Sequence, residues 1–549
     1  MLRSEEPKGI SARPAKVFAR SSESGPTLPN VNLVIVHCHF RPGGVRRVIE
    51  LAVPALAASW RPRLQRVVLL GGEAPNPGWL RTVRHSLPRT PIDCAIDSSA
   101  GYLSEQRASP ASIARRLQTH LEHTLSGVDA ADTVVWAHNQ GLGRNLLLTR
   151  ALTDACRRRG VRLVFHHHDW WLDNRWARWP EMRRCGFRTL DAVARTVFPT
   201  GPEIRHAVIN QSESSILQRQ FGTAAEWIPN PAGHWPKVSN VRRNEVAAWL
   251  ESRLGERAPV WLVPCRLLRR KNLAEAVLLT RWLRPEAWLV TTGGVSSPAE
   301  AAYARTLRDA AQREGWRLKL SVLEGVRSGP SVPELMAASE AVLLTSLQEG
   351  FGLPYVEAAA AGRPLIARSL PNVAPDLEAF GFEFPQGYDE VQIPLSLFDW
   401  PAERARQARL LRNWKASIPA SARARIEPPA FLRTGPAPRA VPFSRLTLTG
   451  QLEVLRHPPD HSWAHCVPLN PHLEPWRQEA ASGRLGITTW PTRADDWLGD
   501  AAYARRLGML LRASPEPVPP DRAVRCQEEL LQSKLHARFL YPLLWASKS

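Results

Sequence analysis

Two successive series of short apolar runs, separated by longer amphipathic stretches, constrain the fold of this chain more than any other feature. Alternation of this kind indicates parallel strands with helices covering both faces of the sheet. The first series predicts strands at residues 31–37, 66–71, 133–137, 161–166 and 206–209. The second series predicts strands at residues 260–264, 287–292, 318–323, 341–345 and 365–368. We therefore expect an α/β protein with two doubly wound, Rossmann-like domains, at 31–235 and 236–400.

The two ends of the 549-residue chain lack this alternation. Residues 1–30 are polar and rich in proline and serine, which predicts a disordered N-terminal tail. Beyond residue 400, a charged helical pattern at 402–415 is followed by a proline-rich linker around 428–442 and a poorly periodic region that ends in the apolar residues 539–545. We expect residues 401–549 to form a helical or irregular C-terminal extension, to which we assign no chemistry.

The composition argues against several classes of protein. No run approaches the ~18 to 20 apolar residues of a membrane-spanning helix, and the N-terminus lacks the apolar core of a signal peptide. The seven cysteines are scattered and odd in number, without a Cys-x-x-Cys pair, so neither a disulfide framework nor a zinc site is expected. A cytoplasmic protein is the expectation that follows.

The net charge of +21 comes from 72 Lys and Arg residues against 51 Asp and Glu residues. It is compatible with anionic partners such as nucleotide phosphates or the headgroups of an inner membrane face. A biased genomic base composition, which enriches Arg, Ala and Pro, explains the charge equally well. Because the sequence contains no recognised nucleic-acid-binding motif, nucleic acid is not an expected partner.

The most informative segment, residues 341–367, has the pattern of a buried strand, a glycine-containing loop, a short helix and the next strand. Pro354 stands at the expected first position of the helix, and Gly362 lies just beyond its end. The loop before the helix therefore brings free backbone N–H groups and a helix N-terminus to the carboxyl edge of a parallel sheet. A diphosphate is a ligand that would fit there.

Two carboxylates flank this predicted anion site. Glu349 lies in the loop, and Glu357 is expected in the first turn of the helix. Carboxylates repel phosphate but accept hydrogen bonds from hydroxyls, which suggests one for the sugar and one for the ribose of a nucleotide sugar. The alternative is that Glu357 only complements the helix dipole and that Glu349 is a solvated loop charge.

A pair of cations follows the predicted strand at 260–264. Arg266 comes shortly after that strand, and Lys271 precedes a helix expected to begin at Asn272, with Glu275 three residues on as in a capping box. Two cations on a strand-to-helix turn are well placed to neutralise a leaving diphosphate.

In the first series, the predicted strand at 31–37 runs into Gly43 and Gly44, ahead of an amphipathic helix. The two glycines would allow a ligand to approach the backbone closely. A plain tight turn is the alternative explanation for them.

These elements, in this order and spacing, resemble glycosyltransferase family 4 over about residues 31–385. The family carries two glutamates separated by seven residues in an EGFGLP-type loop and helix, and Glu349 and Glu357 match that spacing. It also carries Arg, four residues and Lys after the first strand of the second domain, which Arg266 and Lys271 match.

The resemblance implies a GT-B fold, in which two Rossmann-like domains face each other across a cleft. It implies that Glu349 contacts the transferred sugar and that Glu357 contacts the ribose hydroxyls. Arg266 and Lys271 would contact the diphosphate. Backbone amides of the loop would complete the donor site, with the glycine pair facing them. These further residues are Phe351, Gly352 and Leu353 in the loop and Gly43 and Gly44 opposite.

A run of three histidines, His166 to His168, is followed by Asp169 at the end of a predicted strand of the first domain. Family 4 members often have a His-Asp pair at this place, which faces the cleft, so His168 and Asp169 are the matching residues. Successive strand residues point to opposite faces, so the three histidines are not expected to hold one metal ion together. A purely structural role for the imidazoles is the alternative.

Four tryptophans follow this run closely: Trp170, Trp171, Trp176 and Trp179. Indole rings pack well against the apolar face of a pyranose, so these residues could bind an acceptor sugar. Packing inside the protein is an equally open interpretation.

The expected function is retaining transfer of a sugar, of the hexosyltransferase type, from a nucleotide-diphosphate sugar to an acceptor hydroxyl. The resemblance implies a front-face mechanism that needs neither a metal nor a cofactor. The expected partners are the nucleotide-sugar donor and a carbohydrate or lipid-linked acceptor, with peripheral membrane contact an open option. The alternatives are another GT-B nucleotide-sugar enzyme, a phosphorylase or an epimerase, and a non-catalytic protein that binds through basic clusters such as Arg157 to Arg159.

Overall fold

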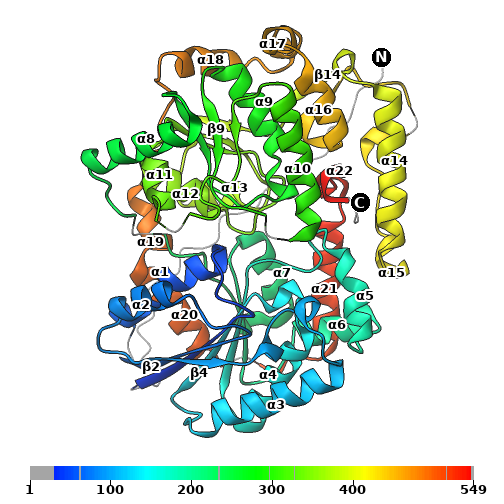
Figure 1. Cartoon of the computed structure of the whole chain (residues 1–549). Coiled ribbons are helices and arrows are strands. Elements are labelled where there is room, and N and C mark those ends of the chain that lie inside the picture. The colour runs from blue at the N-terminus through cyan, green and yellow to red at the C-terminus, as the bar shows by residue number, and fades with distance from the viewer. Residues whose placement is uncertain are drawn as a thin grey trace.

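The computed structural model describes residues 30–60, 63–232, 235–295, 297–326, 328–433, 435–514 and 516–545. The predicted disordered tail at 1–30 lies outside the described residues, apart from Asn30, which begins the first strand. Figure 1 shows two α/β domains, one above the other, with C-terminal helices lying beside both.

The first domain is built on a seven-stranded parallel sheet with the order β3-β2-β1-β4-β5-β6-β7. All five strands predicted for this half are present. The strands β3 and β7 were not predicted, because β3 is an edge strand with exposed side chains and β7 has only three residues. The strands are β1 (Asn30–Val36), β2 (Arg63–Gly71), β3 (Ile92–Ile96), β4 (Thr133–His138), β5 (Arg162–His167), β6 (Ile204–Val208) and β7 (Ala225–Trp227).

The second domain has a six-stranded parallel sheet with the order β10-β9-β8-β11-β12-β13. The strand predicted at 318–323 is only two residues long, because Ser321 has a left-handed backbone (φ +59°) that ends the extended segment. The strands are β8 (Val260–Val263), β9 (Trp288–Thr291), β10 (Leu318–Lys319), β11 (Ala341–Leu344), β12 (Leu365–Arg368) and β13 (Gln386–Tyr388). Both strand orders are those of Rossmann-like domains, which confirms the predicted α/β, GT-B architecture.

Helices connect consecutive parallel strands in both domains. Those of the first domain are α1 (Gly44–Ser59), α2 (Pro77–Ser86), α3 (Pro110–Ser126), α4 (Leu146–Arg159), α5 (Trp179–Arg184), α6 (Leu190–Val197) and α7 (Gln211–Phe221). Those of the second are α8 (Asn240–Leu254), α9 (Leu273–Leu283), α10 (Pro298–Arg313), α11 (Val332–Ala338), α12 (Leu353–Ala360) and α13 (Ala374–Ala379).

The segment after residue 399 is mostly helical. It contains α14 (Trp400–Ala416), α15 (Ala420–Arg423), α16 (Leu448–Arg456), α17 (Pro459–Cys466), α18 (Leu473–Ala481), α19 (Asp495–Leu498), α20 (Asp500–Arg512), α21 (Asp521–Lys534) and α22 (Pro542–Trp545). A short antiparallel pair of strands joins the residues just before this segment to the predicted linker region. The two strands are β14 (Gln392–Pro394) and β15 (Ala440–Pro442). Among the described helices, none combines the length and the apolar character needed to cross a membrane.

Helices of this C-terminal segment complete the cores of both domains. α20 packs on α1, where Tyr503 and Leu507 join the same core cluster as Ile49. α21 packs on α6 and α7 and adds Leu530 and Leu531 to the other core cluster of the first domain. α16, α17 and α18 pack on α9 of the second domain. In Figure 1, α20 and α21 accordingly lie beside the lower domain, while α17 and α18 lie on the upper one.

Lys534, the last residue of α21, fastens this segment to the first domain. Its Nζ atom lies 3.1 Å from Asp173 Oδ1 and 2.5 Å from Glu213 Oε1. Asp173 and Glu213 are both buried. One buried cation therefore balances two buried carboxylates that come from different parts of the first domain.

We predict that Lys534→Ala lowers the free energy of unfolding by about 3 kcal/mol, because it leaves buried Glu213 without its cation and buried Asp173 with only the more distant Arg175, at 3.8 Å. Thermal unfolding should show a lower midpoint for this variant. Arg525→Ala is the matched control, since its ion pair with Asp521 on the same helix is exposed and should contribute less than about 0.5 kcal/mol. Equal midpoints for the two variants would contradict the role given to Lys534.

Candidate active site at the domain interface

The carboxyl ends of the two parallel sheets face each other and are in contact. A Cβ atom built on Gly350, after β11, would lie only 2.4 Å from the carbonyl oxygen of His168, after β5. Asn210 Nδ2 donates to the carbonyl of Gly350 at 3.1 Å, and the Gln211 N–H donates to Asp376 Oδ2 at 3.0 Å. Segments that follow strands in both domains therefore meet along one interface, where ligands bind in such folds.

Glu349, in the loop after β11, is held by two cations of its own domain. Arg270 Nη1 lies 2.6 Å from Glu349 Oε2, and Lys271 Nζ donates to Oε1. Burial by itself would raise the pKa of Glu349, but the charges of Arg270 and Lys271 lower it to about 2. The carboxylate is therefore ionised near neutral pH and is fixed in one orientation.

The turn that carries these cations is tied to β11, because β8 and β11 are neighbours in the sheet. The Leu347 N–H donates to the carbonyl of Arg270 at 2.7 Å. Thr345 Oγ1 donates to the carbonyls of Lys271 and Asn272, at 2.9 and 3.1 Å. These bonds fix the turn relative to β11 while leaving the Lys271 side chain free to pair with Glu349.

Arg266 has a different environment from Lys271. Arg266 is exposed and forms no hydrogen bond or ion pair with any residue that the structure describes. Gly43 of the first domain lies close to it, since a Cβ atom built there would be 3.7 Å from Arg266 Nη2. Desolvation and the charge of Arg270 lower the pKa of Arg266. Arg266 is thus a cation that is available to a ligand.

Glu357 lies on α12 and faces the first domain. Because α12 begins at Leu353, Glu357 is in the second turn of the helix rather than in the predicted first turn. Arg47 Nε, on α1, approaches Glu357 Oε1 to 4.0 Å from the other domain. Burial raises the pKa of Glu357, and the charges of Arg47 and Lys271 oppose this rise. The ionisation of Glu357 therefore depends on a residue of the first domain.

The loop before α12 has the geometry of an anion site. Gly352 has φ +77°, and a Cβ atom there would lie 2.7 Å from the Tyr355 ring, so glycine is required. The amides of Phe351, Gly352 and Leu353 donate to no acceptor within the described part of the chain. Pro354 is the second helical residue, one position later than predicted. Three free N–H groups are therefore available to bind an anion.

The predicted capping box at the start of α9 is wrong. Asn272 has a left-handed backbone (φ +47°), and its side chain caps no backbone N–H. Asn272 Nδ2 donates instead to Glu275 Oε2 at 2.7 Å. Arg368 Nη2 and Tyr388 Oη, the latter at 2.6 Å, donate to the other oxygen of Glu275. Glu275 is fully buried, and its role is to link α9 to β12 and β13.

Asp169 lies at the interface directly after His168. Its Oδ1 atom lies 3.2 Å from Arg175 Nη2, and Asn139 Nδ2 donates to its Oδ2 atom at 3.3 Å. Burial favours the neutral acid, but the charges of Arg175 and Arg270 outweigh it and lower the pKa of Asp169. Arg270 belongs to the second domain, so Asp169 and Glu349 share its positive field across the interface.

The histidines divide between the two faces of the sheet, as strand alternation predicts. His167 Nε2 lies 3.1 Å from His206 Nδ1 on one face. On the other face, His138 of the neighbouring strand joins His166 and His168, with ring nitrogens of all three within 4.8 Å of one another. The run itself does not converge on one point, but the sheet assembles a three-histidine cluster that sequence reasoning missed.

Hydrogen bonds account for the geometry of this cluster. Trp136 Nε1 donates to His166 Nδ1 at 3.3 Å, and His138 Nδ1 lies 3.0 Å from His168 Nε2. These contacts engage one nitrogen of each ring, whereas His138 Nε2 and His166 Nε2 are buried without a hydrogen-bond partner among the described residues. Burial lowers the pKa of His168 to about 3 and holds those of His166 and His138 well below their usual value, so the imidazoles are neutral. The cluster is thus a hydrogen-bonded pair, His138 and His168, with His166 beside it and held by Trp136.

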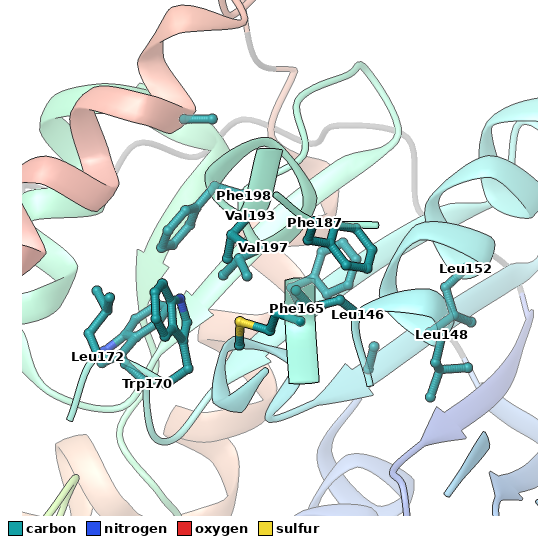
Figure 2. Packing of buried hydrophobic residues seen from close by; sticks show 14 of the residues in the cluster. Leu146, Leu148, Leu152, Phe165, Trp170, Leu172, Phe187, Val193, Val197 and Phe198 are labelled. Carbon is teal, nitrogen blue, oxygen red and sulfur yellow. The ribbon is translucent and has the colours of Figure 1, made fainter. Parts of the chain in front are cut away.

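The four tryptophans after Asp169 are buried in the core of the first domain. Figure 2 shows Trp170 in this core with Phe198 and Leu172, and the Trp170 and Phe198 ring centres are 5.3 Å apart. Their burial favours packing over an acceptor platform. The buried residues are Trp170, Trp171, Trp176 and Trp179.

Sequence reasoning missed several residues of this interface. Arg270 stood in a visible run of cations, but spacing alone did not show that it faces Glu349 with Lys271. The others lie at the last residue of a strand, in strand-following loops or in the first turn of α1, without a recognised motif, and only their positions at the carboxyl ends of parallel strands could have pointed to them. They are Arg47, His138, Asn139 and Arg175.

The second domain matches the model of a known protein family. The model of the family described as "Glycosyl transferases group 1" matches residues 251–382. This segment contains all four charged residues proposed for the donor site, which are Arg266, Lys271, Glu349 and Glu357. The similarity to this family therefore includes every charged residue of the expected donor site.

Two curated proteins of Petrotoga mobilis are similar in sequence. Mannosylglucosyl-3-phosphoglycerate synthase is 24% identical over 349 residues, which are 62% of this chain and 65% of that protein. Mannosylglucosylglycerate synthase is 21% identical over 268 residues, which are 44% of this chain and 60% of that protein. The match thus spans less than two thirds of the length of either relative.

Among solved structures, that of Anabaena Alr3699/HepE in complex with UDP-glucose is 16% identical to the chain, with a TM-score of 0.44 over 82% of this chain and 98% of that chain. At this level of similarity, the GT-B assignment rests on the two strand orders of the chain itself. The chain is a two-domain α/β protein of GT-B architecture whose second domain matches the "Glycosyl transferases group 1" model over residues 251–382.

Proposed function

We propose that the chain is a retaining glycosyltransferase of the family 4 type, which moves a hexosyl group from a nucleotide-diphosphate sugar to an acceptor hydroxyl without a metal ion. The arrangement around Glu349 supports this most strongly. An ionised, oriented carboxylate lies two residues before three free loop amides, and its partner Arg270 also acts on the available cation Arg266. A sugar hydroxyl and a diphosphate are the two groups that such a site accommodates together.

In this proposal the donor occupies the second-domain side of the interface. Glu349 accepts hydrogen bonds from the transferred sugar, and Glu357 accepts them from the ribose. Arg266 and the loop amides contact the diphosphate, and Lys271 adds positive charge beside it. Gly43, with Gly44 after it, leaves room for the donor on the first-domain side.

The proposed reaction is a substitution with retention. The acceptor oxygen bonds to the anomeric carbon on the face from which the diphosphate leaves, the bond between that carbon and the phosphate oxygen breaks, and the acceptor proton passes to a phosphate oxygen. Arg266, Lys271 and the N-terminus of α12 stabilise the charge that develops on the diphosphate. His168 and Asp169 lie on the first-domain side and are proposed to orient a carbohydrate or lipid-linked acceptor.

The alternatives have less support. A phosphorylase or an epimerase would use a similar donor site, but the names of the two relatives describe synthases of sugar conjugates. A basic-surface binding protein is not favoured by the arginine run at the end of α4, since Arg157 and Arg158 pair with Glu203 and Glu122. The run also complements the C-terminal end of the helix dipole. A cytoplasmic location with peripheral membrane contact stays a proposal.

Glu349→Gln is expected to lower turnover at least about tenfold, because a neutral amide loses the charge-assisted bonds to the sugar. Nucleoside diphosphate binding should persist, since Arg266 and the loop amides are untouched. Release of nucleoside diphosphate from a panel of UDP- and GDP-sugars, together with thermal shifts, measures both. Glu378→Gln, an exposed change on α13, is the control. Unchanged turnover in Glu349→Gln would remove this residue from the site.

Arg266→Ala is expected to cost about 2 to 4 kcal/mol of transition-state stabilisation, as for other preorganised groups that stabilise developing charge. Turnover should fall, and affinity for nucleoside diphosphate should fall with it. Steady-state kinetics and calorimetry check the two effects, with Arg305→Ala, an exposed change on α10, as the control. Kinetics equal to those of the unmodified chain would refute the assignment.

Transfer is expected to persist in excess EDTA, because Arg266, Lys271 and the α12 N-terminus supply the positive charge that a leaving diphosphate needs. The assay compares saturating donor and acceptor with and without chelator, after circular dichroism has shown that the fold survives. Loss of turnover that added divalent ion restores would show that the metal-free mechanism is wrong. The cluster of His138, His166 and His168 would then be the first site to test by substitution.

A further inference from the structure

Two arginines that are not among the proposed donor-site residues lie together at the carboxyl edge of the first sheet. Arg144 follows β4, and Arg178 lies in the segment after β5. The Arg144 guanidinium lies 4.7 Å from the centre of the Tyr102 ring, and the Tyr102 hydroxyl lies 2.8 Å from His39 Nε2. Segments that follow four strands of the sheet therefore bring two guanidinium groups, a phenol and an imidazole together.

Neither arginine forms an ion pair with a residue in the described ranges. Arg178 is only 8% exposed, and its Nη1 atom donates to the carbonyl of Leu142. Arg144 Nε is buried without a hydrogen-bond partner. A buried guanidinium that lacks an anionic partner is costly, because it has given up water without gaining a counter-charge.

The carboxylates that act on these two arginines do not supply that counter-charge. Asp169 acts on Arg178 but is engaged by Arg175, whose Nη2 atom lies 3.2 Å from Asp169 Oδ1. Glu105 is engaged by Arg41, with Arg41 Nη2 at 2.9 Å from Glu105 Oε2. Glu181, on α5, has its pKa raised by burial and lowered to a smaller extent by Arg144 and Arg178, but it forms no ion pair with either arginine among the described contacts. The pair of arginines thus retains unsatisfied positive charge.

Like charges add to this imbalance. Burial first, and then the charges of Arg144 and Arg175, hold the pKa of Arg178 well below its usual value. These side chains also face the donor side, since the charge of Arg266 lowers the pKa of both Tyr102 and His39. Burial is the larger influence on each, and it raises the pKa of Tyr102 and lowers that of His39. An oxyanion bound between Arg144 and Arg178 would relieve the repulsion at a place that adjoins the proposed diphosphate site.

We propose that Arg144 and Arg178 bind a carboxylate or phosphate group of the acceptor, so that the sugar is transferred to an anionic molecule. Planar guanidinium groups suit such oxyanions, because their N–H donors match two acceptor oxygens at once. Tyr102 and His39 lie beside them as further polar groups. This inference rests on the proposed glycosyl transfer, but the anion site itself can be tested without turnover.

The test is calorimetric titration of the full chain with inorganic phosphate, 3-phospho-D-glycerate, D-glycerate and glycerol. A saturating nucleoside diphosphate is present to fill the donor site. Arg144→Gln is the main variant, because the Arg144 side chain forms no hydrogen bond or ion pair with a described residue and only packs over the Tyr102 ring, so the fold should tolerate the change. Arg178→Lys keeps the charge but loses the planar donor pair. Arg150→Gln is the control, since Arg150 is an exposed arginine on α4 that packs over Phe187.

The unmodified chain and Arg150→Gln are expected to bind at least one of the anions but not glycerol. Arg144→Gln should bind it about tenfold or more weakly, as expected when a hydrogen bond to a charged group is lost, and Arg178→Lys should also be weakened. The phosphate and glycerate titrations show which oxyanion is preferred. Equal affinity in Arg144→Gln and Arg150→Gln, or no anion binding by the unmodified chain, overturns the proposal.

The same set of variants separates this proposal from the proposed function. Phosphate binding that is lost in Arg266→Ala but kept in Arg144→Gln belongs to the donor site and overturns the acceptor assignment. Anion binding that depends on Arg144, in a chain that binds no nucleoside diphosphate, supports the anion site while the proposed glycosyl transfer fails.

Discussion

The structure depends on one constraint, the place in each sheet where the strand order reverses. In the second domain this place lies between β8 and β11, and in the first it lies between β1 and β4. The segments that follow the two neighbouring strands turn in opposite directions there, which leaves the carboxyl edge of the sheet open to side chains and ligands. Glu349 and Lys271 meet over one reversal point, and His39 and Arg144 stand over the other. The two reversal points face each other, so one interface collects the charged groups of both domains.

Charge is shared across this interface rather than balanced within each domain. Glu349 forms ion pairs with Arg270 and Lys271, and Arg266 is left available to a ligand on the donor side. Arg47 acts in the opposite direction, since it belongs to the first domain but opposes the rise in the pKa of Glu357 caused by burial. Because charge interactions weaken with distance, the ionisation of Glu357 depends on contact between the domains, whereas Glu349 is balanced within its own domain.

The sequence predicted the parts of the site that are encoded locally. The segment from β11 to β12 was predicted because its apolar runs, Gly352 and Pro354 determine strand, loop and helix within a few residues. The partner of Glu349 could not be predicted in this way, because Arg270 meets it only through the adjacency of β8 and β11. Glu275 was mispredicted for the same reason: the local capping pattern is present, but buried donors from β12 and β13 compete for its carboxylate.

The return of α20 and α21 to the first domain has a consequence for synthesis. Tyr503 and Leu507 cover the apolar side of α1, and Leu530 and Leu531 cover α6 and α7, so about 500 residues separate these contacts from β1. A ribosome completes the first sheet long before it adds the helices that cover it. The nascent first domain therefore presents an uncovered apolar surface while the whole second domain is translated, and it requires protection from aggregation until the last turns of the chain emerge.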